Sequence, residues 1–120
     1  MKWADNLYVS EKASKRREKI IRRASKNAGL LNVYFITLAT NGKDLFDIFD
    51  ASYLKLLSFR KQDLDVVGIA VNKADALELT IRILTDVYQQ TGDVRIRDFF
   101  VFSGMDSRNY PRKRRRLWDI

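Results

Sequence analysis

The sequence predicts a single α/β domain with a small, mainly parallel sheet of three strands and three to four helices. Two observations predict this fold. Short apolar runs rich in β-branched and aromatic residues alternate along the chain with longer segments whose apolar residues recur at helical spacing. In addition, 120 residues are enough to bury the core of one domain. Alternation of this kind is typical of parallel strands joined by crossover helices.

Residues 11–27 are predicted to form the first helix, after a short apolar lead-in over residues 3–9. Ser10 is the expected N-cap, and Gly29 is a typical C-terminal cap. The apolar residues, which include Ile20 and Ile21, form only a narrow stripe. Eight basic residues make up much of the rest of this helix: Lys12, Lys15, Arg16, Arg17, Lys19, Arg22, Arg23 and Lys26.

Residues 33–39, 64–71 and 94–102 are predicted to be the three strands. The first two are apolar throughout, which is typical of strands buried on both faces, and residues 64–71 are expected to be central. The third alternates in its first half and is expected at an edge. Residues 44–60 are predicted to form one helix or a helix pair.

Residues 73–90 give the clearest helix pattern, and Gly92 follows the expected end of this helix. Four apolar residues are expected to share one side of it: Leu77, Ile81, Leu84 and Tyr88.

The C-terminal residues 106–120 are predicted to be a disordered basic tail outside a domain of residues 1–105. The only proline, Pro111, is followed by five consecutive cations: Arg112, Lys113, Arg114, Arg115 and Arg116. These residues repel one another, and no apolar pattern provides them with a scaffold.

Positive charge is concentrated at the two ends of the chain. Residues 11–27 hold eight Lys/Arg and two Glu, and residues 106–120 hold six Lys/Arg and two Asp. Residues 28–105 hold eight basic and ten acidic residues. A near-neutral centre with two basic flanks predicts contact with a polyanion. We therefore expect a non-enzymatic protein that binds RNA or DNA through the first helix and the 112–116 cluster.

The composition argues against most common catalytic chemistry. The chain contains no His and no Cys, which excludes a Ser-His-Asp triad, a thiol nucleophile and the usual zinc ligands. We expect no cofactor and no metal. No apolar run approaches the roughly 20 residues that span a bilayer, and the first ten residues lack the pattern of a signal peptide. The expected protein is cytoplasmic, without membrane insertion.

Residues 72–75, Asn-Lys-Ala-Asp, follow the second predicted strand. This arrangement resembles the guanine-recognition motif of P-loop GTPases, in which the Asp hydrogen-bonds the base. The phosphate-binding loop of that family does not occur in the sequence. The preferred interpretation is a helix cap, in which Asn72 is the N-cap and Asp75 bonds back to the start of the helix.

Two alternative functions follow from the predicted parallel sheet. The loops after the first two strands would emerge at the same edge and bring Asn41, Gly42 and Lys43 close to Asn72 and Lys73. Such a cluster predicts a small-anion or nucleotide site, although ordinary capped turns account for the same residues. The other alternative is a protein-interaction or structural module, with self-association through the third strand.

Overall fold

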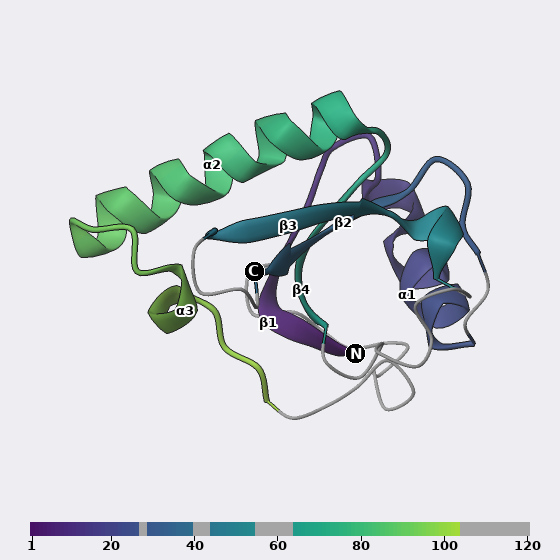
Figure 1. Ribbon diagram of the computed structural model, residues 1–120, viewed down its shortest axis with the longest axis horizontal. Helices are drawn as coiled ribbons and strands as arrows, with labels where there is room; N and C mark the ends of the chain where they lie inside the picture. Colours follow the sequence, from purple (N-terminus) through teal and green to yellow (C-terminus); the bar gives the residue numbers. More distant parts are fainter. Residues whose placement is uncertain (27–28, 40–43, 55–63, 104–120) are drawn as a thin grey trace.

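The computed structural model describes residues 1–26, 29–39, 44–54 and 64–103 (Figure 1). Within these ranges four strands form one mixed sheet, in the spatial order β1-β4-β2-β3. The strands are β1 (Lys2–Val9), β2 (Tyr34–Leu38), β3 (Phe46–Asp50) and β4 (Asp65–Ala70). The predicted α/β class is confirmed, but the predicted three-stranded, mainly parallel sheet is wrong.

The central strand β4 is parallel to one neighbour and antiparallel to the other. It pairs in parallel with β1 and antiparallel with β2, and β2 pairs antiparallel with β3. Val66 and Ile69 of β4 belong to the core on one face of the sheet, whereas Val67 and Ala70 belong to the core on the other. The prediction that this segment is a central strand buried on both faces is confirmed, since all four side chains are fully buried.

One face of the sheet is covered by α1 (Arg17–Ser25). The 3-10 turn η1 (Ser14–Arg16) precedes this helix and has no buried residue. Ile20, Ile21 and Ala24 of α1 are buried in this core. Trp3 and Phe35 meet there edge to face, with their ring centroids 5.5 Å apart. The helix is shorter than predicted, because the chain forms turns from residue 11 to residue 16 before the α-helix begins.

The other face is covered by α2 (Lys73–Thr91), which runs along the sheet in Figure 1, and by the short helix α3 (Ile96–Phe99). Leu79, Ile83 and Val87 of α2 are buried against this face. The helix ends at Gly92, which has a φ of 72° and donates its N–H to the carbonyl of Tyr88. The predicted helix over residues 73–90 and its glycine cap are therefore confirmed.

One strand was not predicted, and one segment that was predicted to be helical contains a strand. The lead-in over residues 3–9 is the edge strand β1. Residues 46–50 form β3 rather than a helix, because Phe46 and Ile48 pack against one core while Asp47 between them is exposed. The element η2 (Ala51–Tyr53) follows β3, with Asp50 accepting a hydrogen bond from the backbone N–H of Ser52.

The predicted third strand over residues 94–102 is also wrong, because this segment contains α3. Phe100 donates its backbone N–H to the carbonyl of Ile96 at 3.2 Å, which is the bond of a helical turn, and both side chains are buried in the same core. Self-association through a strand at this position therefore has no structural basis. Residues 55–63 and the predicted tail, 106–120, lie outside the described residues.

The side chain of Asp75, near the start of α2, forms hydrogen bonds to the residues that follow β1 and β4. Its carboxylate accepts hydrogen bonds from the Ser10 hydroxyl at 2.5 Å and from the backbone N–H of Val71 at 3.0 Å. Its own N–H donates to the side chain of Asn72 at 2.8 Å, so the predicted N-cap is confirmed. The Asp75 carboxylate accepts its hydrogen bonds from Ser10 and Val71 and not from Asn72.

We predict that Asp75→Ala lowers the free energy of unfolding by about 2–3 kcal/mol. The substitution leaves the Ser10 hydroxyl and the Val71 N–H without their acceptor at a buried position. Urea denaturation measures the change. Glu78→Ala is the control for loss of a carboxylate from the same helix at an exposed position. A cost no greater than that of the control would contradict this role.

We also predict that Gly68→Ala is destabilising by about 1–3 kcal/mol through overpacking. A Cβ atom at Gly68 would lie 2.9 Å from Cδ1 of Ile36 and 3.3 Å from Cδ2 of Leu79. Ile36→Val removes the nearest atom. In thermal or urea denaturation, Ile36→Val should therefore cost less in the Gly68→Ala background than in the wild type. Equal costs in the two backgrounds would show that this contact is not the source of the strain.

Candidate functional site

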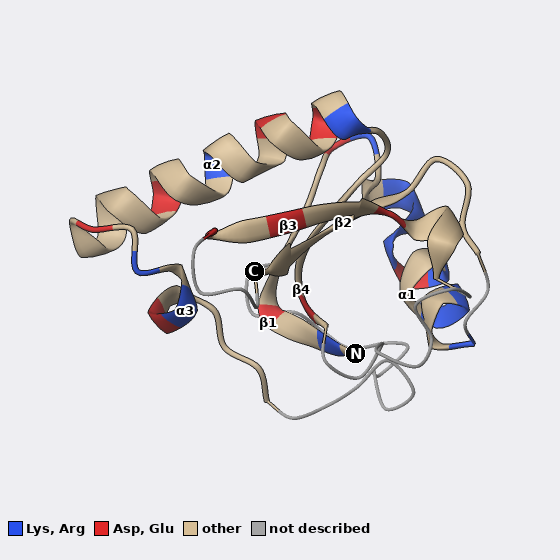
Figure 2. Ribbon diagram, in the orientation of Figure 1, with Lys and Arg blue, Asp and Glu red and all other residues tan. Residues whose placement is uncertain are grey.

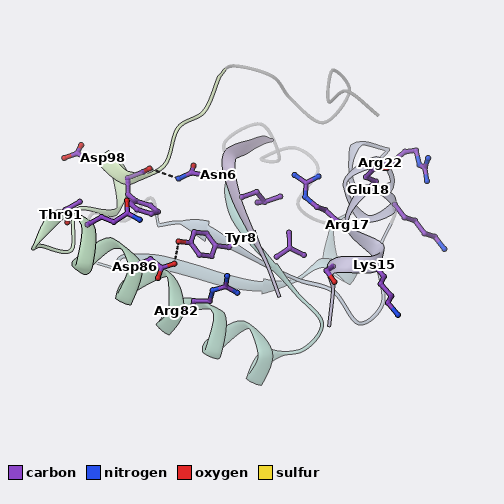
Figure 3. Close-up of a pocket in the computed structure, with 16 residues that line it drawn as sticks. Asn6, Tyr8, Lys15, Arg17, Glu18, Arg22, Arg82, Asp86, Thr91 and Asp98 are labelled. Atoms are coloured by element: carbon purple, nitrogen blue, oxygen red, sulfur yellow. Dashed lines mark hydrogen bonds between the residues drawn. The ribbon is translucent and has the colours of Figure 1, made fainter. Parts of the chain in front are cut away.

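A groove of about 1180 Å³ runs beside β1 at the edge of the sheet (Figure 3). Its floor is formed by residues 6–9 of β1, one wall by η1 and α1, and the other by α2 and α3. The groove exists because β1 pairs with β4 on one side only, while a helix rises from each face of the sheet. It is therefore bounded by segments from the beginning, the middle and the end of the described chain.

The segment after α3 closes one end of the groove. Asp5 donates its backbone N–H to the carbonyl of Val101 at 2.6 Å. The side-chain amide of Asn6 donates to the carbonyl of Phe99 at 3.0 Å and accepts from the N–H of Val101 at 3.2 Å. These bonds occupy the outer edge of β1 at residues 5 and 6, so the groove opens beside residues 7–9.

Cations dominate the groove walls. Five line it: Lys15, Arg17, Lys19, Arg22 and Arg82. Three carboxylates accompany them: Glu18, Asp86 and Asp98. Four of the five cations belong to the first helix region and were predicted as polyanion contacts, whereas Arg82 comes from the opposite wall. The excess of positive charge favours an anionic ligand.

The eight predicted basic residues of the first helix region occupy two different environments. Arg17 is only 8% exposed, and its side chain extends toward β1 in Figure 3. Arg16 is half-buried and donates to the carbonyl of Leu31 at 3.4 Å. These two arginines therefore also serve packing between α1 and its neighbours. The others are exposed: Lys12, Lys15, Lys19, Arg22, Arg23 and Lys26. We call these six residues the basic face.

The basic face is not neutralised by the described part of the protein. Within those ranges, none of its six side chains lies within 4.0 Å of a carboxylate. Figure 2 shows the basic colouring concentrated along α1, while α2 carries both signs of charge. Because Ile20 and Ala24 anchor the opposite side of α1 in the core, the cations are held on a rigid element.

Tyr8 forms the centre of the wall opposite the basic helix. Its hydroxyl donates to Asp86 at 2.6 Å, and the guanidinium of Arg82 lies 5.6 Å from the centre of its ring. The ring also contacts Phe99 and Phe100, with centroids 6.5 Å and 5.9 Å away. Burial, and then the hydrogen bond to Asp86, raise the pKa of the Tyr8 hydroxyl well above its ordinary value. Tyr8 is therefore a neutral hydrogen-bond donor at physiological pH.

Sequence reasoning missed Tyr8, Arg82 and Asp86 as neighbours. Tyr8 and Asp86 are 78 residues apart, and their contact depends on β1 lying at the sheet edge beside α2. In the structure, Leu7 and Tyr8 pack against the cores on opposite faces of the sheet, as neighbouring residues of a strand do. A prediction of an edge strand over residues 2–9 would have led to this arrangement.

The predicted small-anion cluster loses its geometric basis. Because β2 and β4 are antiparallel, the end of β2 at Leu38 and the end of β4 at Ala70 lie at opposite ends of the sheet. The prediction required parallel strands for the two loops to meet. Asn72 and Lys73 remain together at the start of α2, where Asn72 is occupied as the cap. Asn41, Gly42 and Lys43 lie outside the described residues, as do Arg112–Arg116.

Comparison of the chain with protein-family models, curated proteins and solved structures finds no match. Among the described helices, none combines the length and the apolar character needed to cross a bilayer. The groove and the basic face are therefore the features of the protein that indicate a function.

We predict that Tyr8→Phe lowers the free energy of unfolding by about 1 kcal/mol at neutral pH, because it removes a half-buried hydrogen bond to a carboxylate. The effect has a defined pH dependence. The raised pKa means that the folded protein holds the Tyr8 proton more tightly than the unfolded chain does. This stabilisation is present below about pH 10, the ordinary pKa of tyrosine, and is lost as pH rises toward the raised value.

Urea denaturation at neutral pH and above pH 10 tests the predicted effect of Tyr8→Phe and its pH dependence. The difference between wild type and Tyr8→Phe should shrink at alkaline pH. Tyr53→Phe, at an exposed position, is the matched control and should change stability little at either pH. A Tyr8→Phe effect that is constant across this range would contradict the assignment.

Proposed function

We propose that this protein binds the phosphate backbone of RNA or DNA through the basic face. The observation that carries the proposal is a group of six exposed cations on α1 and the segments beside it. Lys12 and Lys15 lie on the turns before α1, and Lys26 follows its last residue. Within α1, Lys19, Arg22 and Arg23 are separated by three and four residues, which places them on one side of the helix. The buried Ile20, Ile21 and Ala24 occupy the opposite side.

The length of the row suits a polymer of phosphates better than a single anion. At about 1.5 Å per residue, the part of the basic face from Lys19 to Lys26 extends over about 10 Å, and Lys12 and Lys15 on the preceding turns add to it. Duplex DNA carries one phosphate for about every 1.7 Å of its axis, so a row of this length meets several phosphates. A small anion would engage only two or three of these side chains and would leave the others unneutralised.

The repulsion within the row also favours a polyanionic partner. Lys19 and Arg23 of α1 are four residues apart, and Lys19 and Arg22 three, and such like-charged pairs oppose helix formation by a few tenths of a kcal/mol each. No described carboxylate forms an ion pair with any of these three cations. A bound polyanion would relieve it.

The groove extends the proposed surface. Lys15, Lys19 and Arg22 belong both to the basic face and to the groove wall. A nucleic-acid strand that follows the basic face would pass the mouth of the groove, with Arg82 on its far side. We propose that the groove accommodates part of such a strand, and that the hydroxyl of Tyr8, because it is held by Asp86, serves mainly to fix this wall.

A salt titration tests this function. The affinity of the full chain for single-stranded RNA, single-stranded DNA and duplex DNA is measured by fluorescence anisotropy over a range of salt concentrations. Binding should weaken steeply with salt. Lys19→Gln with Arg23→Gln should reduce the slope of log K against log salt by about two, since each phosphate contact contributes nearly one.

The matched control is Lys2→Gln with Arg95→Gln, which removes the same net charge at exposed positions outside the basic face. It should leave the slope nearly unchanged. Equal effects of the two double variants, or no binding to any probe at low salt, would overturn the proposal. Replacement of all five residues of the 112–116 cluster by Gln in the full chain separately measures the contribution of that cluster.

A further inference from the structure

The long helix α2 carries a second apolar side, of which Leu84 alone packs against the protein's own core. Leu77, Ile81 and Tyr88 are 48%, 63% and 61% exposed, and Leu84 between them is partly buried. We call these four residues the α2 stripe. The residues of α2 that pack on the sheet are different ones, among them Leu79, Ile83 and Val87.

The α2 stripe lies beside the buried side of the helix, with Leu77, Ile81 and Tyr88 exposed and Leu84 in contact with the core. Its residues follow one another at intervals of four, three and four, which is the spacing of the contact positions in a two-stranded coiled coil. A helix that covers only one sheet needs a single apolar side, and α2 already has it in Leu79, Ile83 and Val87. The second side therefore indicates a helix partner rather than a further contact within the domain.

We propose that the α2 stripe is the interface of a homodimer in which two copies of α2 pack in parallel about a two-fold axis. In such an arrangement each residue of the stripe meets its own counterpart, so one apolar surface serves both copies. Leu77, Ile81 and Tyr88 are exposed, so a second copy of α2 can reach them without displacing the sheet. Figure 1 shows α2 along the outside of the domain, as this geometry requires.

The flanking charges select the parallel orientation. Lys73 and Glu78 are both exposed and lie on either side of the α2 stripe, five residues apart. This is the separation of the two flanking positions that pair between the helices of a parallel coiled coil. A parallel dimer therefore places Lys73 of each copy beside Glu78 of the other. An antiparallel pair would oppose Leu77 and Tyr88 and would separate these charges.

The size of the stripe predicts a weak dimer. It covers only about two heptads, and three side chains that are half to two-thirds exposed supply much less than the about 800 Å² that each partner contributes to a standard interface. The association should therefore depend on protein concentration. The proposed dimer does not depend on the proposed nucleic-acid binding, which uses the basic face and the groove.

Sedimentation equilibrium of the full chain from about 1 µM to about 1 mM tests the dimer, because weak complexes populate over this range. The average mass should rise from one chain toward two. Leu77→Gln with Ile81→Gln should abolish the rise. The melting temperature of the dilute protein should change little, because both positions are exposed. Leu31→Gln with Val101→Gln, two exposed apolar positions elsewhere, should leave the rise intact. A wild-type chain that stays monomeric, or equal effects of the two double variants, would overturn the proposal.

Cysteine crosslinking tests the orientation, because the chain contains no native Cys. A parallel dimer brings the two copies of residue 77 together, so Leu77→Cys should form a disulfide-linked dimer under oxidation. In an antiparallel pair the same residues would be roughly 16 Å apart, beyond the about 7 Å that a disulfide spans. Gln89→Cys, exposed on the same helix but off the stripe, should not crosslink. Loss of the Leu77→Cys crosslink with the dimer retained would overturn the parallel arrangement.

A charge exchange provides a test that does not touch the stripe. Glu78→Lys should raise the dissociation constant about 2- to 10-fold, the range for two exposed ion pairs. Adding Lys73→Glu to the same chain should restore the wild-type value. If the double exchange is no tighter than Glu78→Lys alone, Lys73 and Glu78 do not meet and the proposed register is wrong.

Discussion

The burial of β4 on both of its faces is the constraint on which the rest of the structure depends. Val66 and Ile69 require cover on one side of the sheet, and Val67 and Ala70 require it on the other. The hydrophobic effect therefore demands a helix layer on each face. The chain meets this demand with α1 on one face and α2 on the other, and Asp75 fastens the start of α2 to the ends of β1 and β4. All other features of the domain are arranged around this sandwich.

The surfaces proposed for function are the sides of the helices that this packing leaves exposed. α1 must turn Ile20 and Ile21 inward, which fixes its cations in a row that faces outward. α2 must turn Leu79 and Ile83 inward, which leaves the α2 stripe outside. The groove has the same origin, because β1 is the edge of a sheet with a helix on each face. The basic face lies on α1 and the segments beside it, and the α2 stripe includes none of the α2 residues that line the groove, so binding of a polyanion and pairing of α2 are physically compatible.

The parts of the fold that the sequence predicted correctly are those with a long or continuous pattern. The helix over 73–90 repeats its apolar residues over five turns, and the strands over 33–39 and 64–71 are apolar at nearly every position. The segments predicted wrongly are short and half-exposed. Leu45 and the β3 residues Ile48 and Phe49 mimic helical spacing, and the pairing of β3 with β2 across the sheet identifies a strand. Residues 94–102 contain an apolar run typical of a strand, but the N–H of Phe100 bonds to the carbonyl of Ile96 and closes a helical turn.

The sequence by itself determined that this is an α/β protein with a concentrated basic helix and with little of the usual catalytic chemistry. Residue type and local spacing suffice for those statements. Only the tertiary structure decided that β2 and β4 are antiparallel, that β1 forms the second edge, and that Tyr8, Arg82 and Asp86 meet across the groove. It also decided which of the two apolar sides of α2 is buried. The reason is that local periodicity specifies which residues share a side, whereas strand order and contact between distant segments depend on how the whole core is filled.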